Sequence, residues 1–193
     1  MIRFQDYKVY GLISVLALAS WWLTQWQFER NPILGSSENS PDLISHGYYK
    51  MTMDQDGLPK SELLASEMRH YPKDGSNQFT QPVMTLFKPD QAPWVLQSET
   101  AVMDKDGDTL HMNGKSVIER EESANNKALT VYSADLLVKL STHFAESKAF
   151  TELFSPPHKT TGTGVEVTFS SPIHLKLLST VKGYYELKKN HNH

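Results

Sequence analysis

The chain lacks cysteine entirely and is poor in basic residues. None of its 193 residues carries a thiol, which excludes a disulfide scaffold, thiol catalysis and thiolate metal sites but is compatible with either redox compartment. Lys and Arg number 19 against 22 Asp and Glu, and the formal net charge is -3 with no evident basic cluster. A nucleic-acid partner is therefore not expected, because phosphate recognition normally needs a basic patch.

Motifs for catalysis and for metal or cofactor binding are also missing. The sequence contains no G-x-S-x-G motif, no glycine-rich phosphate loop leading into a helix, and no carboxylates paired in a cleft-forming context. The acidic turn Asp104–Asp108 departs from the EF-hand template, since Thr109 stands where Gly is required and Lys115 where the closing Glu is required. No two of the eight histidines have helical i, i+4 spacing. We predict no enzymatic activity, no metal site and no cofactor.

One long apolar run is present, from Val9 to Trp26. As a helix, its 18 residues at about 1.5 Å each would span roughly 27 Å, close to the hydrocarbon core of a bilayer. Arg3 and Lys8 precede the run, so the positive-inside bias places the N-terminus in the cytoplasm and everything after Phe28 across the membrane. The predicted membrane-anchor side chains include Val9, Leu12, Leu16, Trp21 and Trp22.

Two interpretations of this run compete with an uncleaved anchor, namely a cleavable signal peptide and a buried core helix. Ala17-Leu18-Ala19 resembles a signal-peptide cleavage site, but the apolar run continues through Trp21, Trp22 and Leu23 directly after it. A buried core helix is disfavoured because the run has no amphipathic period and is followed by a polar spacer. A single-pass anchor is therefore the favoured interpretation.

The rest of the chain is predicted to be all-β. We divide the sequence into an anchor (1–28), a Ser/Asn/Pro-rich linker (29–46), a β-domain (47–188) and a polar tail (189–193). Short alternating runs rich in β-formers follow one another from Tyr48, separated by turn signals such as Asp56-Gly57, Asp106-Gly107 and Thr161–Gly164. Such a pattern is typical of a sandwich, roll or barrel.

A degenerate repeat organises this β-region. Three segments share an apolar residue, a serine, an acidic residue close behind, and two strands running back on each other. The marker serines are Ser66, Ser98 and Ser133, and a period of just over thirty residues fits a stacked array of hairpin-like units. The middle unit, Trp94–Arg120, turns at Asp106-Gly107, as expected of a hairpin with a primed turn.

The apolar residues of each strand fall on one face by two-residue alternation. On this basis Phe79 shares a side with Val83, and the middle repeat directs one stripe toward the interior. That stripe contains Trp94, Leu96, Leu110, Met112 and Ile118. Such stripes make either a filled core or a lined hollow, and a filled core is the default for an arbitrary sandwich.

The layout of anchor, spacer and β-repeats, together with Asn77–Val83 (NQFTQPV) and Tyr184–Leu187 (YYEL), resembles the LptC family of lipopolysaccharide export proteins. The resemblance covers essentially the whole chain. It implies a twisted β-jellyroll of two antiparallel sheets, which holds the acyl chains of lipopolysaccharide in a lined hollow. It also implies an inner-membrane anchor with the C-terminal domain in the periplasm. The implied partners are lipopolysaccharide, the inner-membrane ABC transporter LptB, LptF and LptG, and the periplasmic bridge protein LptA.

The resemblance further implies which residues contact lipid. Lipid-contacting positions of the family fall on Phe79, Tyr185, Tyr48 and Leu175, and the apolar stripes add Val83, Trp94, Leu110, Met112 and Ile118. The chain departs from its relatives at one corner, where Ser155 and Pro156-Pro157 follow Phe154 in place of Tyr-Gly. The alternative hypothesis is a membrane-tethered β-scaffold that organises an envelope complex and binds no lipid.

Overall fold

The computed structural model describes residues 13–23, 39–89, 91–123, 126–170 and 172–185. These belong to two compact units, residues 1–40 and 41–193. In the first unit, residues 13–23 form a helix in which Leu16, Trp21 and Trp22 are exposed. Within the described ranges, no helix has both the length and the apolarity needed to cross a bilayer. The predicted anchor residues Val9 and Leu12 lie outside the described residues.

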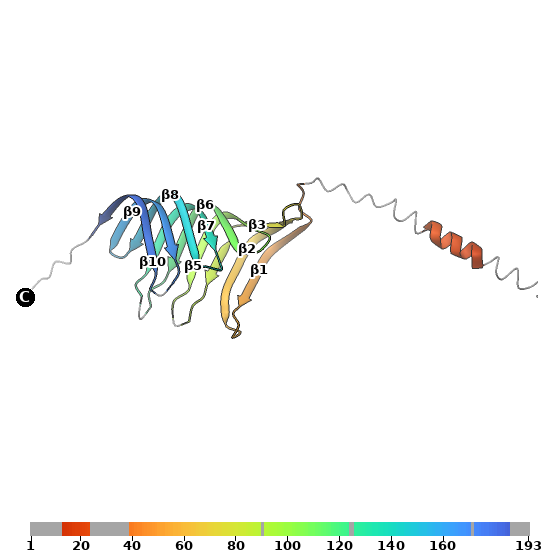
Figure 1. The fold of residues 1–193 in the computed structure, drawn as a ribbon, viewed down its shortest axis with the longest axis horizontal. Coiled ribbons are helices and arrows are strands. Elements are labelled where there is room, and N and C mark those ends of the chain that lie inside the picture. The colour runs from red at the N-terminus through yellow and green to blue at the C-terminus, as the bar shows by residue number, and fades with distance from the viewer. Residues whose placement is uncertain (1–12, 24–38, 90, 124–125, 171, 186–193) are drawn as a thin grey trace, which may run out of the picture. The chain divides into compact units, whose positions relative to one another are not determined.

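The second unit is one antiparallel β-sheet. Its strands are β1 (Leu43–Met53), β2 (Pro59–Tyr71), β3 (Ser76–Thr80), β4 (Val83–Leu86), β5 (Trp94–Met103), β6 (Thr109–Arg120), β7 (Leu129–Lys139), β8 (Phe144–Ser155), β9 (His158–Thr168) and β10 (His174–Tyr184). They pair in the order β1-β2-β3-β5-β6-β7-β8-β9-β10, with β4 between β2 and β5. Figure 1 shows them following one another from β1 to β10. The first strand starts inside the stretch predicted to be linker.

The prediction of an all-antiparallel β-fold is confirmed, but the strands form one ten-stranded sheet and not two. The long strands are interrupted near their middles by shifts in pairing register, for example between Ser98 and Thr100 of β5 and between Ser147 and Phe150 of β8. Such bulges bend a strand and increase its twist. Residues with positive φ mark the same line across the sheet, namely Gly47, Gln81, Gly114, Asp135, Gly164 and Thr180. We call this line the seam.

The marker serines of the sequence repeat lie at the seam. The Ser66 hydroxyl donates to the Thr80 carbonyl at 3.0 Å, and the Ser98 hydroxyl donates to the Thr100 carbonyl at 2.9 Å. Ser133 Oγ lies 2.9 Å from Thr151 Oγ1. A short hydroxyl can satisfy backbone carbonyls that a bulge leaves without a ladder partner. For Ser66 and Ser98 the repeat therefore has a local structural cause, because each hydroxyl satisfies a carbonyl where its strand bends, whereas Ser133 pairs with a second hydroxyl.

The bend brings the two ends of the strands together. We call lip A the connections β1–β2, β4–β5, β6–β7 and β8–β9, and lip B the connections β2–β3, β5–β6, β7–β8 and β9–β10. Trp94 at the lip A end of β5 stacks on Phe169 just after β9 at lip B, with ring centroids 5.4 Å apart. The sheet is therefore folded at the seam into two facing halves with their lips opposed.

The core lies between these two halves. Its members are buried to 9% exposure or less and come from strands β2 to β9 and from Phe169. The inward face changes parity across the seam, because Trp94 and Leu96 are buried before the β5 bulge and Ala101 and Met103 after it. The bulge thus lets one strand point apolar side chains inward on both halves.

Two strand predictions fail at the seam. Phe79 and Val83 do not lie on one strand, because the chain breaks between β3 and β4 at Gln81, whose φ is 49°. The break reverses the parity, so Val83 pairs with Leu64 and Gln97 and lies on the outer face. The expectation that Val83 shares a face with Phe79 is therefore wrong, and Met84 takes the inward position.

A second error concerns Thr161–Gly164. This stretch was predicted to be a turn but lies inside β9, where Gly164 adopts a φ of 77° at the seam. The neighbouring strand β10 likewise continues through a bulge, where its register shifts between Ser179 and Lys182. Glycines and polar residues that signal turns in a sequence also suit mid-strand bulges, since both need positive φ.

The acidic turn Asp104–Asp108 connects β5 to β6 and is held by its first carboxylate. Asp104 Oδ1 accepts hydrogen bonds from the amides of Asp108 at 3.0 Å and Thr109 at 3.2 Å. Burial acts to raise the pKa of Asp104, but the hydrogen bonds from Thr109, Asp108 and Gly107 outweigh it and lower the pKa below 3.8. The turn thus uses its carboxylate internally.

A pH-dependent contribution to stability follows from this turn. Because the folded-state pKa of Asp104 is depressed, its stabilising effect is complete above the unfolded value and is lost as the pH falls through the folded value. We expect Asp104→Asn to be less stable than the unmodified protein at pH 7 and the difference to shrink below pH 3.8. Urea unfolding at both pH values checks this, and a difference that grows on acidification would contradict it.

Candidate functional site

The candidate site is the interior between the two halves of the sheet. The five interior residues predicted for the middle repeat are all there: Trp94 is 1% exposed, and Leu96, Leu110, Met112 and Ile118 are 0% exposed. Their inward orientation is confirmed. Residues without exposed surface leave no space for a ligand beside them, so this part of the interior is packed and the implied open hollow is not present here.

Tyr48 and Phe79 lie together toward the β1 end of this interior. Their ring centroids are 5.3 Å apart with the planes tilted by 55°, a favourable aromatic contact. Phe79 is 2% exposed, whereas Tyr48 is partly buried on the edge strand β1 and packs against the core. Burial raises the pKa of the Tyr48 hydroxyl, which therefore stays protonated at neutral pH.

Leu175 and Tyr185 lie at the other end of the sheet, on and just after β10. Leu175 is partly buried and packs against the core, as its predicted stripe required. Tyr185 is 72% exposed and stacks on His158, with ring centroids 5.4 Å apart. The structure thus brings Tyr48 to Phe79 but leaves Tyr185 outside the interior, and Val181 on β10 is exposed too.

Trp94 closes the lips near the middle of the sheet. Besides stacking on Phe169, it lies under the Arg120 guanidinium, whose central carbon is 4.6 Å from the ring centroid. Burial lowers the pKa of Arg120, and one of its terminal nitrogens donates to the Lys127 carbonyl at 3.2 Å. Trp94, Phe169 and Arg120 form a contact between the lips that we call the lip clasp.

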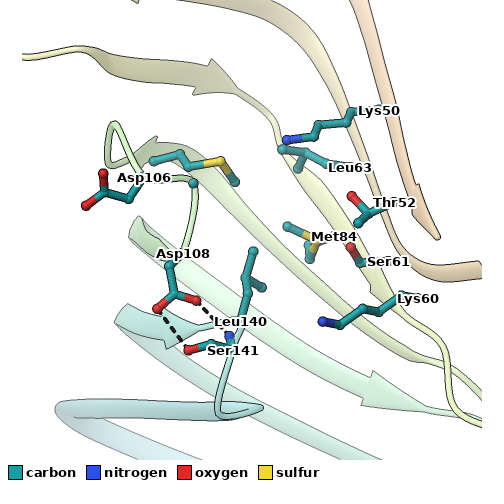
Figure 2. Close-up of a pocket in the computed structure, with 12 residues that line it drawn as sticks. Lys50, Thr52, Lys60, Ser61, Leu63, Met84, Asp106, Asp108, Leu140 and Ser141 are labelled. Atoms are coloured by element: carbon teal, nitrogen blue, oxygen red, sulfur yellow. Dashed lines mark hydrogen bonds between the residues drawn. The ribbon is translucent and has the colours of Figure 1, made fainter. Parts of the chain in front are cut away.

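Nearer β1, the lips are separated by a cavity of about 270 Å³ (Figure 2). Its floor is apolar and comprises Leu63, Met84, Met103 and Leu140. Lip A and the adjoining ends of β1 and β2 contribute Lys50, Thr52, Lys60 and Ser61, whereas lip B contributes Asp106, Gly107, Asp108 and Ser141. The cavity is the place where the apolar interior opens between the lips.

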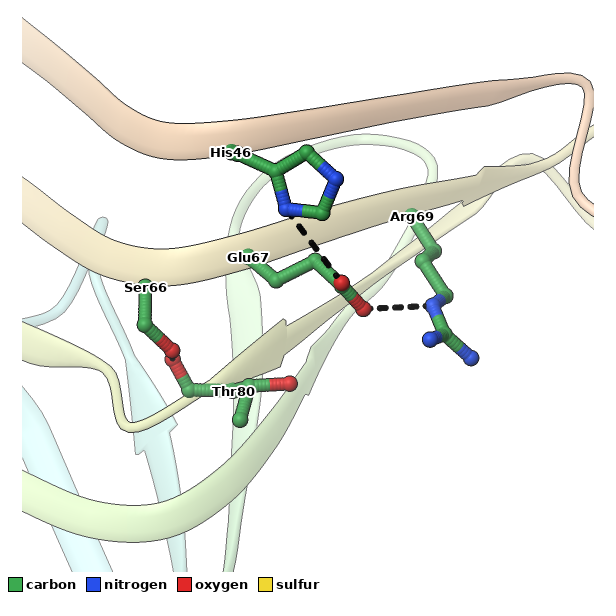
Figure 3. A network of polar contacts seen from close by, with 5 residues as sticks. All are labelled: His46, Ser66, Glu67, Arg69 and Thr80. Atoms are coloured by element: carbon green, nitrogen blue, oxygen red, sulfur yellow. Dashed lines mark hydrogen bonds and ion pairs between the residues drawn. The ribbon is translucent and has the colours of Figure 1, made fainter.

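The two edges of the sheet are free in the described part of the chain, because β1 and β10 each pair on one side only. Both carry exposed apolar side chains, including Ile44 and Tyr49 on β1 and Leu178 and Val181 on β10. Figure 3 shows how β1 is fixed on the outer face, where Glu67 of β2 lies 3.5 Å from His46 and 2.6 Å from Arg69. Such edges are templates for pairing with another strand.

Several residues of the site were not predicted from the sequence. Met84 was missed because the break at Gln81 reversed the parity of its strand, and Arg120 and Phe169 because their partners lie far away in sequence. Lys50 and Lys60 carry no local motif, although two-residue alternation from Tyr48 would have placed Lys50 inward. No group of three or more metal-binding side chains occurs among the described residues.

At the corner where the chain departs from its expected relatives, the Ser155 hydroxyl donates to the Ala128 carbonyl at 3.1 Å, and the Pro156-Pro157 bond that follows is cis. Ser155 ends β8 and His158 begins β9, so the two prolines form a short lip A connection. The corner is therefore made by a serine and two prolines, without a glycine.

Comparison with known proteins places this architecture. The structure resembles the crystal structure of LptH from Pseudomonas aeruginosa, described as the LptA-homologous periplasmic component of the lipopolysaccharide transport device, with a TM-score of 0.52. The match covers 66% of this chain and 95% of LptH at 10% identity, and so speaks for the fold alone. No curated protein matches significantly in sequence. The family described as "Lipopolysaccharide-assembly, LptC-related" matches residues 12–186, so the chain belongs to the LptC family and its role is in lipopolysaccharide transport.

Proposed function

We propose that this chain accepts lipopolysaccharide from the inner-membrane ABC transporter formed by LptB, LptF and LptG and passes it to the periplasmic bridge protein LptA. The observation that carries this proposal is the apolar interior, which opens between the lips and lies between two unpaired sheet edges. The chain contains no motif for nucleotide binding or catalysis, so the energy for transport comes from a partner.

The interior suits acyl chains because exposing them to water is unfavourable by about 0.8 kcal/mol per methylene. A path lined by Tyr48, Phe79, Leu110, Met112 and Ile118 would remove most of that cost. These side chains are packed in the structure, so lipid entry requires the lips to separate and the core side chains to move apart. Val83 lies on the outer face and is not part of this path.

The free edges suit transfer between proteins of similar fold. A β-strand of the transporter's periplasmic part pairing with β1, and a strand of LptA pairing with β10, would join three sheets edge to edge. The interiors would then form one continuous apolar path. In this arrangement Leu175 and Tyr185 lie at the exit, and the N-terminal run containing Leu16, Trp21 and Trp22 anchors the chain in the inner membrane.

Photocrosslinking tests this edge assignment in cells that contain the whole transport system. We expect a photoreactive amino acid at Tyr49 on β1 to capture LptF or LptG, and one at Val181 on β10 to capture LptA. Tyr132 is a matched control, because it is 48% exposed but lies on the central strand β7. Equal capture of LptA from Tyr132 and Val181 would contradict the assignment.

The packed interior favours a second candidate, the tethered scaffold that binds no lipid. Binding of a fluorescent apolar probe to the domain that starts near Ser40 distinguishes the transport function from the scaffold function. Under our proposal the probe enters the interior and lipopolysaccharide displaces it. Absence of uptake in the presence of intact partner binding would favour the scaffold.

A further inference from the structure

The cavity between the lips carries an unusual set of unpartnered donors. Lys50 and Thr52 on β1 and Lys60 and Ser61 on β2 line it from one side. Within the described ranges, none of these four side chains forms an ion pair or a hydrogen bond. Figure 2 shows both ammonium groups directed toward the cavity from the lip A side. Two charges and two hydroxyls therefore converge above an apolar floor.

Neither carboxylate of the cavity forms an ion pair with these lysines. Asp108 accepts from the Ser141 amide at 2.7 Å and from the Ser141 hydroxyl at 2.9 Å, so both of its oxygens are engaged within lip B. Asp106 points away from the lysines in Figure 2. One further cation lies near these lips, since burial, then Lys88 and then Lys60 lower the pKa of His143.

Protection of an edge strand explains only part of this arrangement. An inward-facing lysine on β1 discourages unwanted strand pairing, and Lys50, which pairs with the buried Leu63, fits that role. Lys60 and Ser61 lie on β2, which is paired on both sides and needs no such protection. Edge protection therefore leaves Lys60 and Ser61 unexplained, and two ammonium groups with two hydroxyls are a donor set that suits an anionic group.

We propose that Lys50, Lys60, Thr52 and Ser61 bind a phosphate group on the sugar headgroup of lipid A, while the acyl chains extend past Leu63 and Met84 into the interior. This inference rests on the proposed function, since it assigns the headgroup position of the transported lipid. A cavity of about 270 Å³ falls just below the usual range for whole small-molecule ligands, about 300–1,000 Å³. It suits a phosphate with its adjoining sugar atoms better than an entire lipid.

Native mass spectrometry of the full chain in detergent tests the proposal by direct competition. Bisphosphorylated lipid A and its enzymatically dephosphorylated form are offered together at equal concentration, and their bound fractions are read from one spectrum. We expect the unmodified chain to prefer the phosphorylated form about tenfold, as two partly exposed ammonium–phosphate contacts would give. The Lys50→Gln/Lys60→Gln double variant should bind both forms equally.

Control variants and a competition with inorganic phosphate complete the experiment. Lys50→Arg/Lys60→Arg should keep the preference, and so should Lys115→Gln, which removes an exposed lysine at the seam. Equal binding of both lipids to the unmodified chain, or an unchanged preference in the Gln double variant, overturns the headgroup site. Inorganic phosphate that abolishes the preference at lipid-equivalent concentration overturns the assignment to a lipid. Failure of both lipids to bind would instead refute the proposed function itself.

Discussion

The Phe79→Glu variant is expected to lose its folded β-domain. Phe79 is 2% exposed and stacks on Tyr48, so the substitution removes a buried ring and places a carboxylate in an apolar interior. Loss of a buried Phe alone costs about 3–5 kcal/mol, and an unpaired charge adds further. Because domains are stable by about 5–15 kcal/mol, the sum is comparable with the whole stability. Circular dichroism and urea unfolding measure the effect.

Two further variants, one toward β1 and one just after β10, separate folding from lipid binding. Phe79→Leu keeps an apolar side chain and should remain folded, with a cost smaller than that of the glutamate. Tyr185→Glu should leave stability nearly unchanged, because Tyr185 is 72% exposed, while lipopolysaccharide capture in a pull-down decreases. If Phe79→Glu unfolds cooperatively at the same urea concentration as the unmodified protein, the interior is open at this position.

The Trp94→Ala variant is expected to cost about 3–5 kcal/mol of unfolding free energy. Trp94 is 1% exposed and is the shared member of the lip clasp, so its removal also frees Phe169 and Arg120. Arg120 would then lose the ring beneath its guanidinium, while its buried Nε still has no hydrogen-bond partner among the described residues. Urea unfolding of the domain gives the free energy.

Trp94→Phe is the matched control, because it retains an aromatic ring between Phe169 and Arg120 and should cost less than the alanine variant. The weakened clasp should also accelerate uptake of an apolar probe in the variants that remain folded. A Trp94→Ala cost below that of Trp94→Phe would show that the lips are held together elsewhere.

Local patterns in the sequence predicted the elements of this domain well, with the largest errors at the seam. The hairpin around Asp106-Gly107 and the inward stripe of Leu110, Met112 and Ile118 could be predicted because alternation and turn chemistry act between near neighbours. The serine repeat was detected as a period. Its cause, a hydroxyl that satisfies a carbonyl at a bulge, depends on pairing that no local pattern reveals.

Two-residue alternation assigned side chains to the wrong face where the backbone departed from regular pleating. One residue of positive φ at Gln81 exchanged the inward and outward faces of the following strand, so that Met84 and not Val83 entered the core. The number of sheets was also predicted wrongly, because one sheet bent at its middle and two separate sheets bury the same apolar stripes. The lip clasp and the lysine cavity combine residues from opposite strand ends, which only the fold brings together.

The seam has a mechanical consequence. Every long strand crosses it, so the two facing halves are covalently continuous and share one hydrogen-bonded ladder. Widening the interior would then bend each strand further open at the seam, while the hydrogen-bonded pairs between neighbouring strands persist. The resistance to that motion comes from apolar packing and the lip clasp, not from broken backbone hydrogen bonds. If lipid enters as proposed, the lips would therefore separate against the free energy of core packing, and the same packing would favour their closure once the lipid leaves.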